Sequence, residues 1–114
     1  MEINSREKSD IDIVILDISG YVDLYNAPEI MNMIDNFCDT KKYNIIMNLK
    51  DVKYIDSSGI GVLISCLLRL KEHQRGLKII NIKASVKKVF ELTNLLAFFD
   101  IYDSEIDAIK AFEH

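Results

Sequence analysis

The sequence predicts an α/β domain in which about four helices cover a mixed, mostly parallel central sheet of four to five strands. Three observations lead to this prediction. Short apolar runs at residues 11–18, 43–49 and 77–82 are typical of buried strands. Longer segments between them carry apolar residues at three- and four-residue spacing, as amphipathic helices do. Strands that alternate with helices pair in parallel through right-handed crossovers, whereas the first strand can run antiparallel.

The size and composition of the chain fit one folded domain over residues 1–114. Hydrophobic residues make up 49% and charged residues 28%, which is typical of soluble globular proteins. The net charge of −4 is atypical of a protein that binds nucleic acid. The longest uncharged apolar stretch has 12 residues, too few to cross a membrane, and the N-terminus lacks an apolar signal core. We therefore expect a cytoplasmic protein without membrane insertion.

Two strands and a helix are expected in the N-terminal part. Residues 2–8 alternate weakly between apolar and polar and predict an edge strand. Residues 11–18 are rich in β-branched side chains and predict a core strand that ends at Ser19-Gly20. The next helix should begin after a polar loop, with Asn26 as its N-cap, and should end near residues 39–42.

A polar turn, Asp56-Ser57-Ser58-Gly59, lies between an apolar strand and an apolar helix. Side-chain oxygens of Asp and Ser accept hydrogen bonds from the unpaired first-turn N–H groups, so one or both serines should lie at a helix N-terminus. The helix dipole tolerates a phosphate at this end. A phosphoserine would add a charge of about −1.5 to −2 beside Asp56, which makes this surface a candidate binding switch.

The helix that begins at Ser57 is predicted to run to about Arg75, with Gly76 as its stop. Its polar residues recur at three- and four-residue spacing and form one stripe, opposite a face of Ile and Leu. Small residues in this stripe would let a partner's backbone approach closely, so we expect Gly61 and Ser65 to belong to a docking face. The whole stripe consists of Ser58, Gly61, Ser65, Arg69 and Glu72.

The C-terminal part continues the alternation of strands and helices. The expected elements are a strand at 77–82, a helix capped by Ser85, an apolar turn at 95–99, a short strand at 101–102, and a helix through Ile106, Ile109 and Phe112. Charge is uneven here, because the segment from Arg69 to Lys88 is basic and the residues from Asp100 onward are acidic. Solvated helix faces explain such runs, and a patch that steers a partner is the alternative.

An enzyme is the rival class of protein. Ser57 lacks the glycine two residues earlier that a nucleophile elbow needs, and His73 and His114 have no evident route to it. Ser85-Val-Lys-Lys88 matches Ser-x-x-Lys, a pattern so common that a helix cap is the better interpretation. The chain has no glycine-rich phosphate-binding loop. We expect no catalysis, cofactor or metal, and we expect Cys38 and Cys66 to be reduced and packed.

Taken together, these motifs resemble the STAS domain family and, within it, the bacterial anti-sigma factor antagonists. The resemblance covers almost the whole chain. Its most specific part is Ile55-Asp-Ser-Ser-Gly-Ile-Gly61, which follows a strand. Supporting motifs are Gly20-x-x-Asp23 with Ala27-Pro-Glu29, and residues 86–90. Each motif alone is weak, whereas three in the family's order are strong.

The resemblance implies a partner-switching protein. In such antagonists an anti-sigma factor serine kinase phosphorylates the serine directly after the aspartate, which is Ser57 here. The unphosphorylated form binds the kinase and frees a sigma factor, and a phosphatase resets the switch. We expect a monomer when the chain is alone. The expected partner-binding residues are Asp23, Asp56, Ser58, Gly59, Gly61 and Ser65.

Two alternatives stay open. Ser57 and Ser58 could act only as helix caps. A STAS module that is never phosphorylated, and that serves as a scaffold, a stressosome-type subunit or a lipid-transport subunit, would share every feature of the fold. Tyr21 and the pair Lys53-Tyr54 depart from the commonest family pattern close to the expected docking surface, and they bear on which partner docks.

Overall fold

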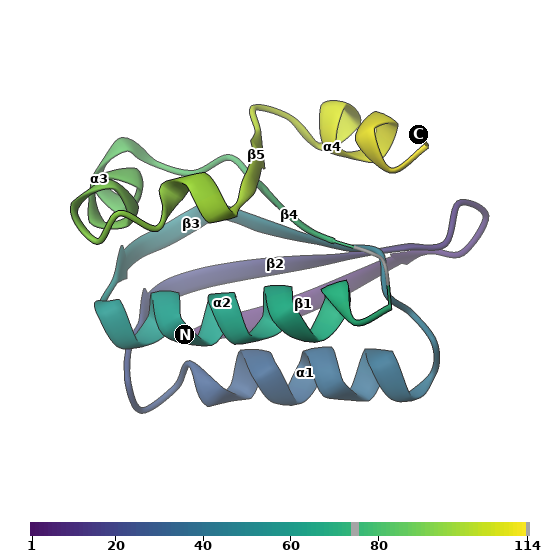
Figure 1. The fold of residues 1–114 in the computed structure, drawn as a ribbon, viewed down its shortest axis with the longest axis horizontal. Coiled ribbons are helices and arrows are strands. Elements are labelled where there is room, and N and C mark those ends of the chain that lie inside the picture. Colours follow the sequence, from purple (N-terminus) through teal and green to yellow (C-terminus); the bar gives the residue numbers. More distant parts are fainter. Residues whose placement is uncertain (74–75, 114) are drawn as a thin grey trace.

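The computed structural model describes residues 1–73 and 76–113, and it has a five-stranded sheet at its centre (Figure 1). The elements in chain order are β1 (Glu2–Lys8), β2 (Ile13–Val22), α1 (Pro28–Asp39), β3 (Ile45–Ile55), α2 (Ser57–Lys71), β4 (Leu77–Ile80), α3 (Ala84–Leu92), the 3₁₀ helix η1 (Leu96–Phe98), β5 (Asp100–Tyr102) and α4 (Glu105–Phe112).

The strands lie in the order β1-β2-β3-β4-β5, which is also their order along the chain. β1 runs antiparallel to β2, and each later pair of neighbours is parallel. α1 and α2 lie side by side, and α4 lies on the opposite side of the sheet (Figure 1). The predicted α/β fold, with a mixed and mostly parallel sheet and four helices, is confirmed.

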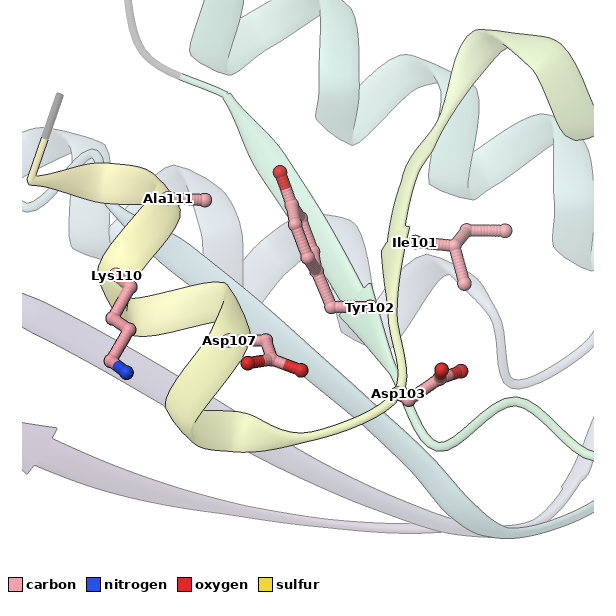
Figure 2. A pocket seen from close by; sticks show the side chains of 6 residues that line it. All are labelled: Ile101, Tyr102, Asp103, Asp107, Lys110 and Ala111. Carbon is pink, nitrogen blue, oxygen red and sulfur yellow. The ribbon is translucent and has the colours of Figure 1, made fainter.

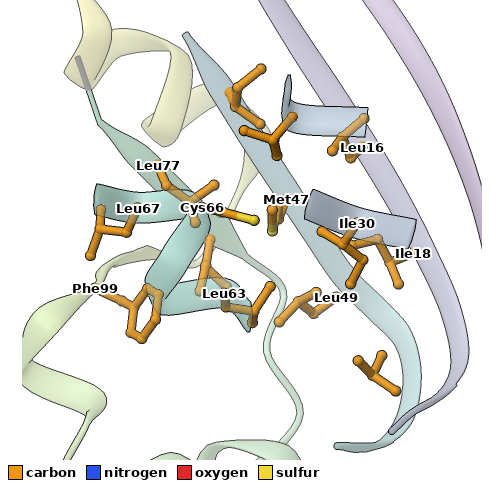
Figure 3. Close-up of a cluster of buried hydrophobic side chains, with 14 of the residues drawn as sticks. Leu16, Ile18, Ile30, Met47, Leu49, Leu63, Cys66, Leu67, Leu77 and Phe99 are labelled. Atoms are coloured by element: carbon orange, nitrogen blue, oxygen red, sulfur yellow. The ribbon is translucent and has the colours of Figure 1, made fainter. Parts of the chain in front are cut away.

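Two hydrophobic cores of unequal size hold the layers together. The main core joins β2, β3 and β4 to α1, α2 and α3, and Met47 and Cys66 lie near its centre (Figure 3). Successive side chains of a strand point to opposite faces, so the other face of the sheet receives Ile13, Ile15 and Ile46. Among the described residues, α4 is the one helix that covers this smaller core, to which it contributes the buried Ala108.

Lys78 is the one polar residue among the described residues that is buried, at 8% exposure. Its ammonium lies 4.6 Å from the centre of the Phe112 ring of α4 and 5.5 Å from that of Tyr102. The carboxylate of Asp100 lies 3.4 Å from the same Nζ atom. The cation–π contact with Phe112 therefore helps to attach α4 to the sheet, whereas the contacts with Tyr102 and Asp100 join β4 to β5.

The ends of β2, β3 and β4 differ from the predicted ones because of strand pairing and backbone conformation. β2 continues through Ser19-Gly20 to Val22, because Gly20 adopts a φ of +90° within the strand and does not form a turn. β3 was expected to end at Leu49, but it pairs with β2 as far as Ile55. Register shifts accompany this extension, which marks β-bulges near the ends of the two strands. β4 is shorter than predicted and ends at Ile80, before an Asn81 with φ of +58°.

Two predicted helix caps are wrong. Ala27, and not Asn26, is the N-cap residue of α1, and the side chain of Asn26 bonds within the preceding loop. Ser85 lies inside the first turn of α3, whose N-cap is Lys83 without a side-chain bond. The described part of α2 ends at Lys71, and its predicted end near Arg75 lies outside the described residues.

A polar network covers the open part of the smaller core's face. Arg6 on β1 binds Asp17 on β2 through Nε (2.6 Å) and Nη2 (2.9 Å), and Nη2 also donates to Glu105 of α4 at 2.8 Å. Asn48 on β3 donates to Oδ1 of Asp17 at 2.8 Å. The hydrogen bonds from Arg6 and then Asn48 hold the pKa of Asp17 below its ordinary value of 3.8, against the opposing effect of burial.

This lowered pKa predicts a pH dependence of stability. A carboxyl group whose pKa is lower in the folded state stabilises the fold above its ordinary pKa, and the stabilisation is lost as the pH falls. Between about pH 6 and pH 2, the wild type should therefore lose more unfolding free energy than Asp17→Asn. Urea denaturation at a series of pH values measures this, with Asp10→Asn in the exposed β1–β2 turn as control. Equal losses for wild type and Asp17→Asn would contradict the prediction.

Candidate functional site

The N-terminus of α2 presents the two serines that the sequence singled out. Asp56 is the N-cap residue, and its Oδ1 accepts a hydrogen bond from the backbone N–H of Gly59 at 2.8 Å. Ser57 and Ser58 are the first two helical residues, which confirms their expected placement at a helix N-terminus. Ser57 is exposed and Ser58 is half-buried. The hydroxyl of Ser57 is therefore the more accessible of the two.

Gly59 lies below this surface, although we expected it among the partner-binding residues. It is buried, and a Cβ atom there would lie 2.8 Å from Cγ1 of Ile55 and 3.0 Å from Cγ1 of Val22. The carbonyl oxygen of Val22 would lie at 3.2 Å. The missing side chain lets α2 pack closely onto the ends of β2 and β3. Gly59 thus positions Ser57 and is not itself open to a partner.

The exposed side of α2 carries the predicted small residues and one that the sequence analysis missed. Gly61 and Ser65 are exposed, and a Cβ added at Gly61 would meet no atom within 4 Å. Ser65 Oγ donates back to the carbonyl of Gly61 at 3.2 Å. Leu68 continues this side at 58% exposure and was hidden in the apolar pattern. Near the C-terminal end of the stripe, Arg69 forms an ion pair with Asp35 of α1 at 3.3 Å. This end of the stripe therefore contacts the neighbouring helix.

Asp23 organises the loop between β2 and α1. Its Oδ1 accepts hydrogen bonds from the backbone N–H groups of Tyr25 (2.9 Å) and Asn26 (3.0 Å). In turn, the side chain of Asn26 accepts a hydrogen bond from the backbone N–H of Asp23 and donates one to the carbonyl oxygen of Tyr21. Such Asx turns fix a loop conformation locally. The backbone N–H of Asp56 donates to the carbonyl of Val22 at 3.1 Å, which brings this loop next to the start of α2.

Large exposed apolar side chains lie near the ends of β2 and β3 and in the β2–α1 loop. Tyr21 and Tyr54 are 60% and 50% exposed, and their ring centres are 6.4 Å apart at an interplanar angle of 54°. Leu24 and Tyr25 in the β2–α1 loop are also exposed. Tyr21 and Tyr54 stood out in the sequence only as departures from a pattern, whereas Leu24 and Tyr25 gave no signal. The pairing of Tyr21 with Tyr54 depends on the register between β2 and β3, which the composition of the chain does not reveal.

A separate hollow of about 440 Å³ lies beside α4 (Figure 2). It contains none of the predicted site residues, and its lining consists of Ile101, Tyr102, Asp103, Asp107, Lys110 and Ala111. Within residues 1–73 and 76–113, no group of three or more His, Cys, Asp or Glu could hold a metal ion. No helix in this part of the chain is long and apolar enough to span a membrane. Both cysteines are free and buried, and burial raises the pKa of the Cys66 thiol to about 12.

Comparisons with known proteins agree with this geometry. The model of the STAS domain family matches residues 2–108. The chain is 29% identical over 101 residues to the anti-sigma-B factor antagonist of Bacillus subtilis, covering 89% of this chain and 92% of that protein.

Two solved structures share the fold. The anti-sigma factor antagonist SpoIIAA in its unphosphorylated form aligns with a TM-score of 0.82 at 21% identity, covering 98% of this chain and 96% of that one. The Bacillus cell fate determinant SpoIIAA in its phosphorylated form aligns with a TM-score of 0.72 at 20% identity, over 97% and 99% of the two chains. At these identities the likeness shows the fold.

Proposed function

The chain belongs to the STAS domain family, and from this premise we propose that it is a partner switch controlled by phosphorylation of Ser57. The unphosphorylated form binds an anti-sigma factor serine kinase and thereby releases a sigma factor. Phosphorylation of Ser57 ends this binding, and a phosphatase restores it. The name of the B. subtilis relative, an anti-sigma-B factor antagonist, supports this assignment.

The observation that carries the proposal is the exposed Ser57 hydroxyl at the N-terminus of α2. A kinase can reach this hydroxyl without unfolding the domain. A phosphate there lies close to unpaired N–H groups and to the positive end of the helix dipole, so the fold tolerates it. For a docked partner the same phosphate is a new charge of about −1.5 to −2 at the centre of the contact. The modification therefore changes the surface and leaves the fold intact.

One phosphate is enough to account for the loss of kinase affinity that the switch requires. A hundredfold loss of affinity corresponds to about 2.8 kcal/mol. Desolvating a charged phosphate against a surface built for a small hydroxyl costs energy of this order, since a buried group without partners costs about 1–3 kcal/mol and more when charged. Asp56 adds a second negative charge next to Ser57. No large conformational change is needed to explain such a loss.

Phosphopeptide mass spectrometry tests the modification itself. We would recover the protein from its native cells as the wild type, as Ser57→Ala and as Ser58→Ala. The expected result is phosphate on Ser57 in the wild type and in Ser58→Ala, and none in Ser57→Ala. Absence of phosphate under every growth condition, with partners indifferent to residue 57, would overturn the proposal. That outcome favours the unphosphorylated scaffold, stressosome-type or lipid-transport module.

A bulky side chain at Gly61 should weaken docking without weakening the fold. A Cβ at Gly61 meets nothing within 4 Å, so Gly61→Leu should leave the unfolding free energy within about 1 kcal/mol of the wild type. On a face where a partner's backbone approaches closely, the same side chain should lower the affinity for the kinase by about tenfold or more. Isothermal titration calorimetry measures this, with the exposed Lys71→Leu on the last turn of α2 as control. Unchanged affinity in Gly61→Leu would remove Gly61 from the docking face.

A further inference from the structure

Four exposed side chains form what we call the tyrosine patch: Tyr21, Leu24, Tyr25 and Tyr54. They come from the end of β2, the β2–α1 loop and the end of β3. Tyr21 and Tyr54 are at least half exposed. Scattered exposed apolar residues need no explanation, but the rings of Tyr21 and Tyr54 are neighbours, and contiguous exposed apolar surface marks an interaction surface.

The Tyr21–Tyr54 pair is a product of the irregular strand pairing. Register shifts between Asp17 and Ser19 and between Gly20 and Tyr21 make Tyr54 the direct neighbour of Tyr21 on the adjacent strand. The next pair along the strands, Val22 and Ile55, points into the main core. Because side chains alternate along a strand, the two tyrosines point away from that core. Bulges of this kind re-aim side chains and are frequent next to functional sites.

The patch is rigidly connected to the proposed phosphorylation site. Tyr54 precedes Ser57 by three residues, so at most about 10 Å separates their Cα atoms. The hydrogen bond from Asp56 to Val22 fixes the end of β2 against the same turn. A typical protein interface buries about 800 Å² on each partner, equivalent to a disc of about 16 Å radius. The Cα atom of Tyr54 therefore lies within the radius of an interface centred on Ser57.

Charge on the surrounding segments favours one kind of partner surface. Segments 21–29 and 50–58 contain more carboxylates than lysines: Asp23, Glu29, Asp51 and Asp56 against Lys50 and Lys53. A complementary partner is therefore basic. Arginine suits both features, because its guanidinium group pairs with carboxylates and stacks on aromatic rings.

We propose that the tyrosine patch is an anchor that holds the serine kinase, through an arginine-bearing face of the kinase that stacks on Tyr21 and Tyr54. This inference rests on the proposed function and adds a contact surface to it. Exposed tyrosines supply large contact area at low entropic cost and are enriched among residues that dominate binding energy. Partner choice then depends on these rings as well as on the region around Ser57.

Titration calorimetry with each purified anti-sigma factor kinase of the native cell tests the patch. Tyr21→Ala combined with Tyr54→Ala should weaken binding to the preferred kinase by about 30-fold. Tyr21→Phe combined with Tyr54→Phe keeps both rings and should bind like the wild type. Ile106→Ala removes an equally exposed apolar side chain from α4 and is the matched control. Ser57→Asp serves as the reference for loss of the switch.

Each outcome separates the patch from the switch. If the alanine double variant binds like the wild type while Ser57→Asp does not bind, the anchor role of the tyrosine patch is wrong and the proposed switch at Ser57 is retained. If the phenylalanine pair loses as much affinity as the alanine pair, ring stacking is wrong. If the wild type binds none of the kinases, the proposed function fails and the anchor fails with it. Circular dichroism and thermal unfolding of the variants should match the wild type, since both tyrosines are at least half exposed.

Discussion

Ser57→Asp is expected to lower the affinity for the kinase by at least about a hundredfold, a cost of about 2.8 kcal/mol. The variant places a negative charge where the docking surface offers a small hydroxyl, directly next to the carboxylate of Asp56. The fold should not change, because an acidic side chain in the first turn of a helix interacts favourably with the dipole, by about 0.3–1 kcal/mol. Calorimetric titration and urea denaturation measure the two effects separately.

Ser57→Asn is the matched control for this variant. Asparagine has nearly the shape of aspartate but no charge, so any difference between the two variants measures electrostatic exclusion of the partner. We expect Ser57→Asn to retain most of the affinity. Equal losses in both variants would show that size at residue 57, and not charge, breaks the contact. A phosphate would then act through its bulk.

Gly59→Ala should destabilise the domain by about 1–3 kcal/mol, whereas Gly61→Ala should not destabilise it at all. The new Cβ at residue 59 would lie 2.8 Å from a side-chain carbon of Ile55 and 3.2 Å from the carbonyl oxygen of Val22. The backbone of β2 cannot move aside without disturbing the hydrogen bond between Val22 and Asp56. At residue 61 the Cβ meets nothing, and alanine in a helix is more favourable than glycine by up to about 1 kcal/mol.

Urea denaturation of the two glycine variants and the wild type measures this contrast. Both substitutions add one methyl group to the same helix, two residues apart, so differences in helix propensity largely cancel. Kinase binding should fall in Gly59→Ala because the start of α2 is displaced from the ends of β2 and β3. Similar midpoints for the two variants would show that α2 can shift outward at little cost. The close packing at Gly59 would then not position Ser57.

Local patterns predicted the architecture and the helix start that carries Ser57, and tertiary pairing decided what they did not predict. Residues 45–49 read as a strand because they are continuously apolar, but the extension of β3 to Ile55 depends on its pairing with β2. Gly20 predicts a strand end because glycine usually marks a turn, but pairing with the neighbouring strands keeps it within β2. The start of α2 is a local signal, and the placement of Ser57 and Ser58 at this helix N-terminus was predicted correctly.

The residues of the proposed docking surface show the same difference between local pattern and tertiary pairing. Asp23, Gly61 and Ser65 belong to short motifs or to one helix face, and the structure places Asp23 in the adjoining loop and the other two on an exposed side. The pairing of Tyr21 with Tyr54 joins residues more than thirty positions apart through strand register. Gly59 looks like its neighbour Gly61 in the sequence, and only the packing of α2 on the sheet distinguishes them.

The unequal cores on the two faces of the sheet have a consequence for how the domain opens. α4 is a helix of eight residues that buries one alanine fully, packs Ile109 and Phe112 partly against the smaller core, and binds Arg6 through Glu105. Elements with few buried contacts open at lower free energy than the rest of a domain. Amide protons of α4 should therefore exchange with solvent well before those of α2 and β3. The surface around Ser57 would remain folded while α4 opens. Local unfolding of the C-terminal helix should therefore not affect recognition of the partner.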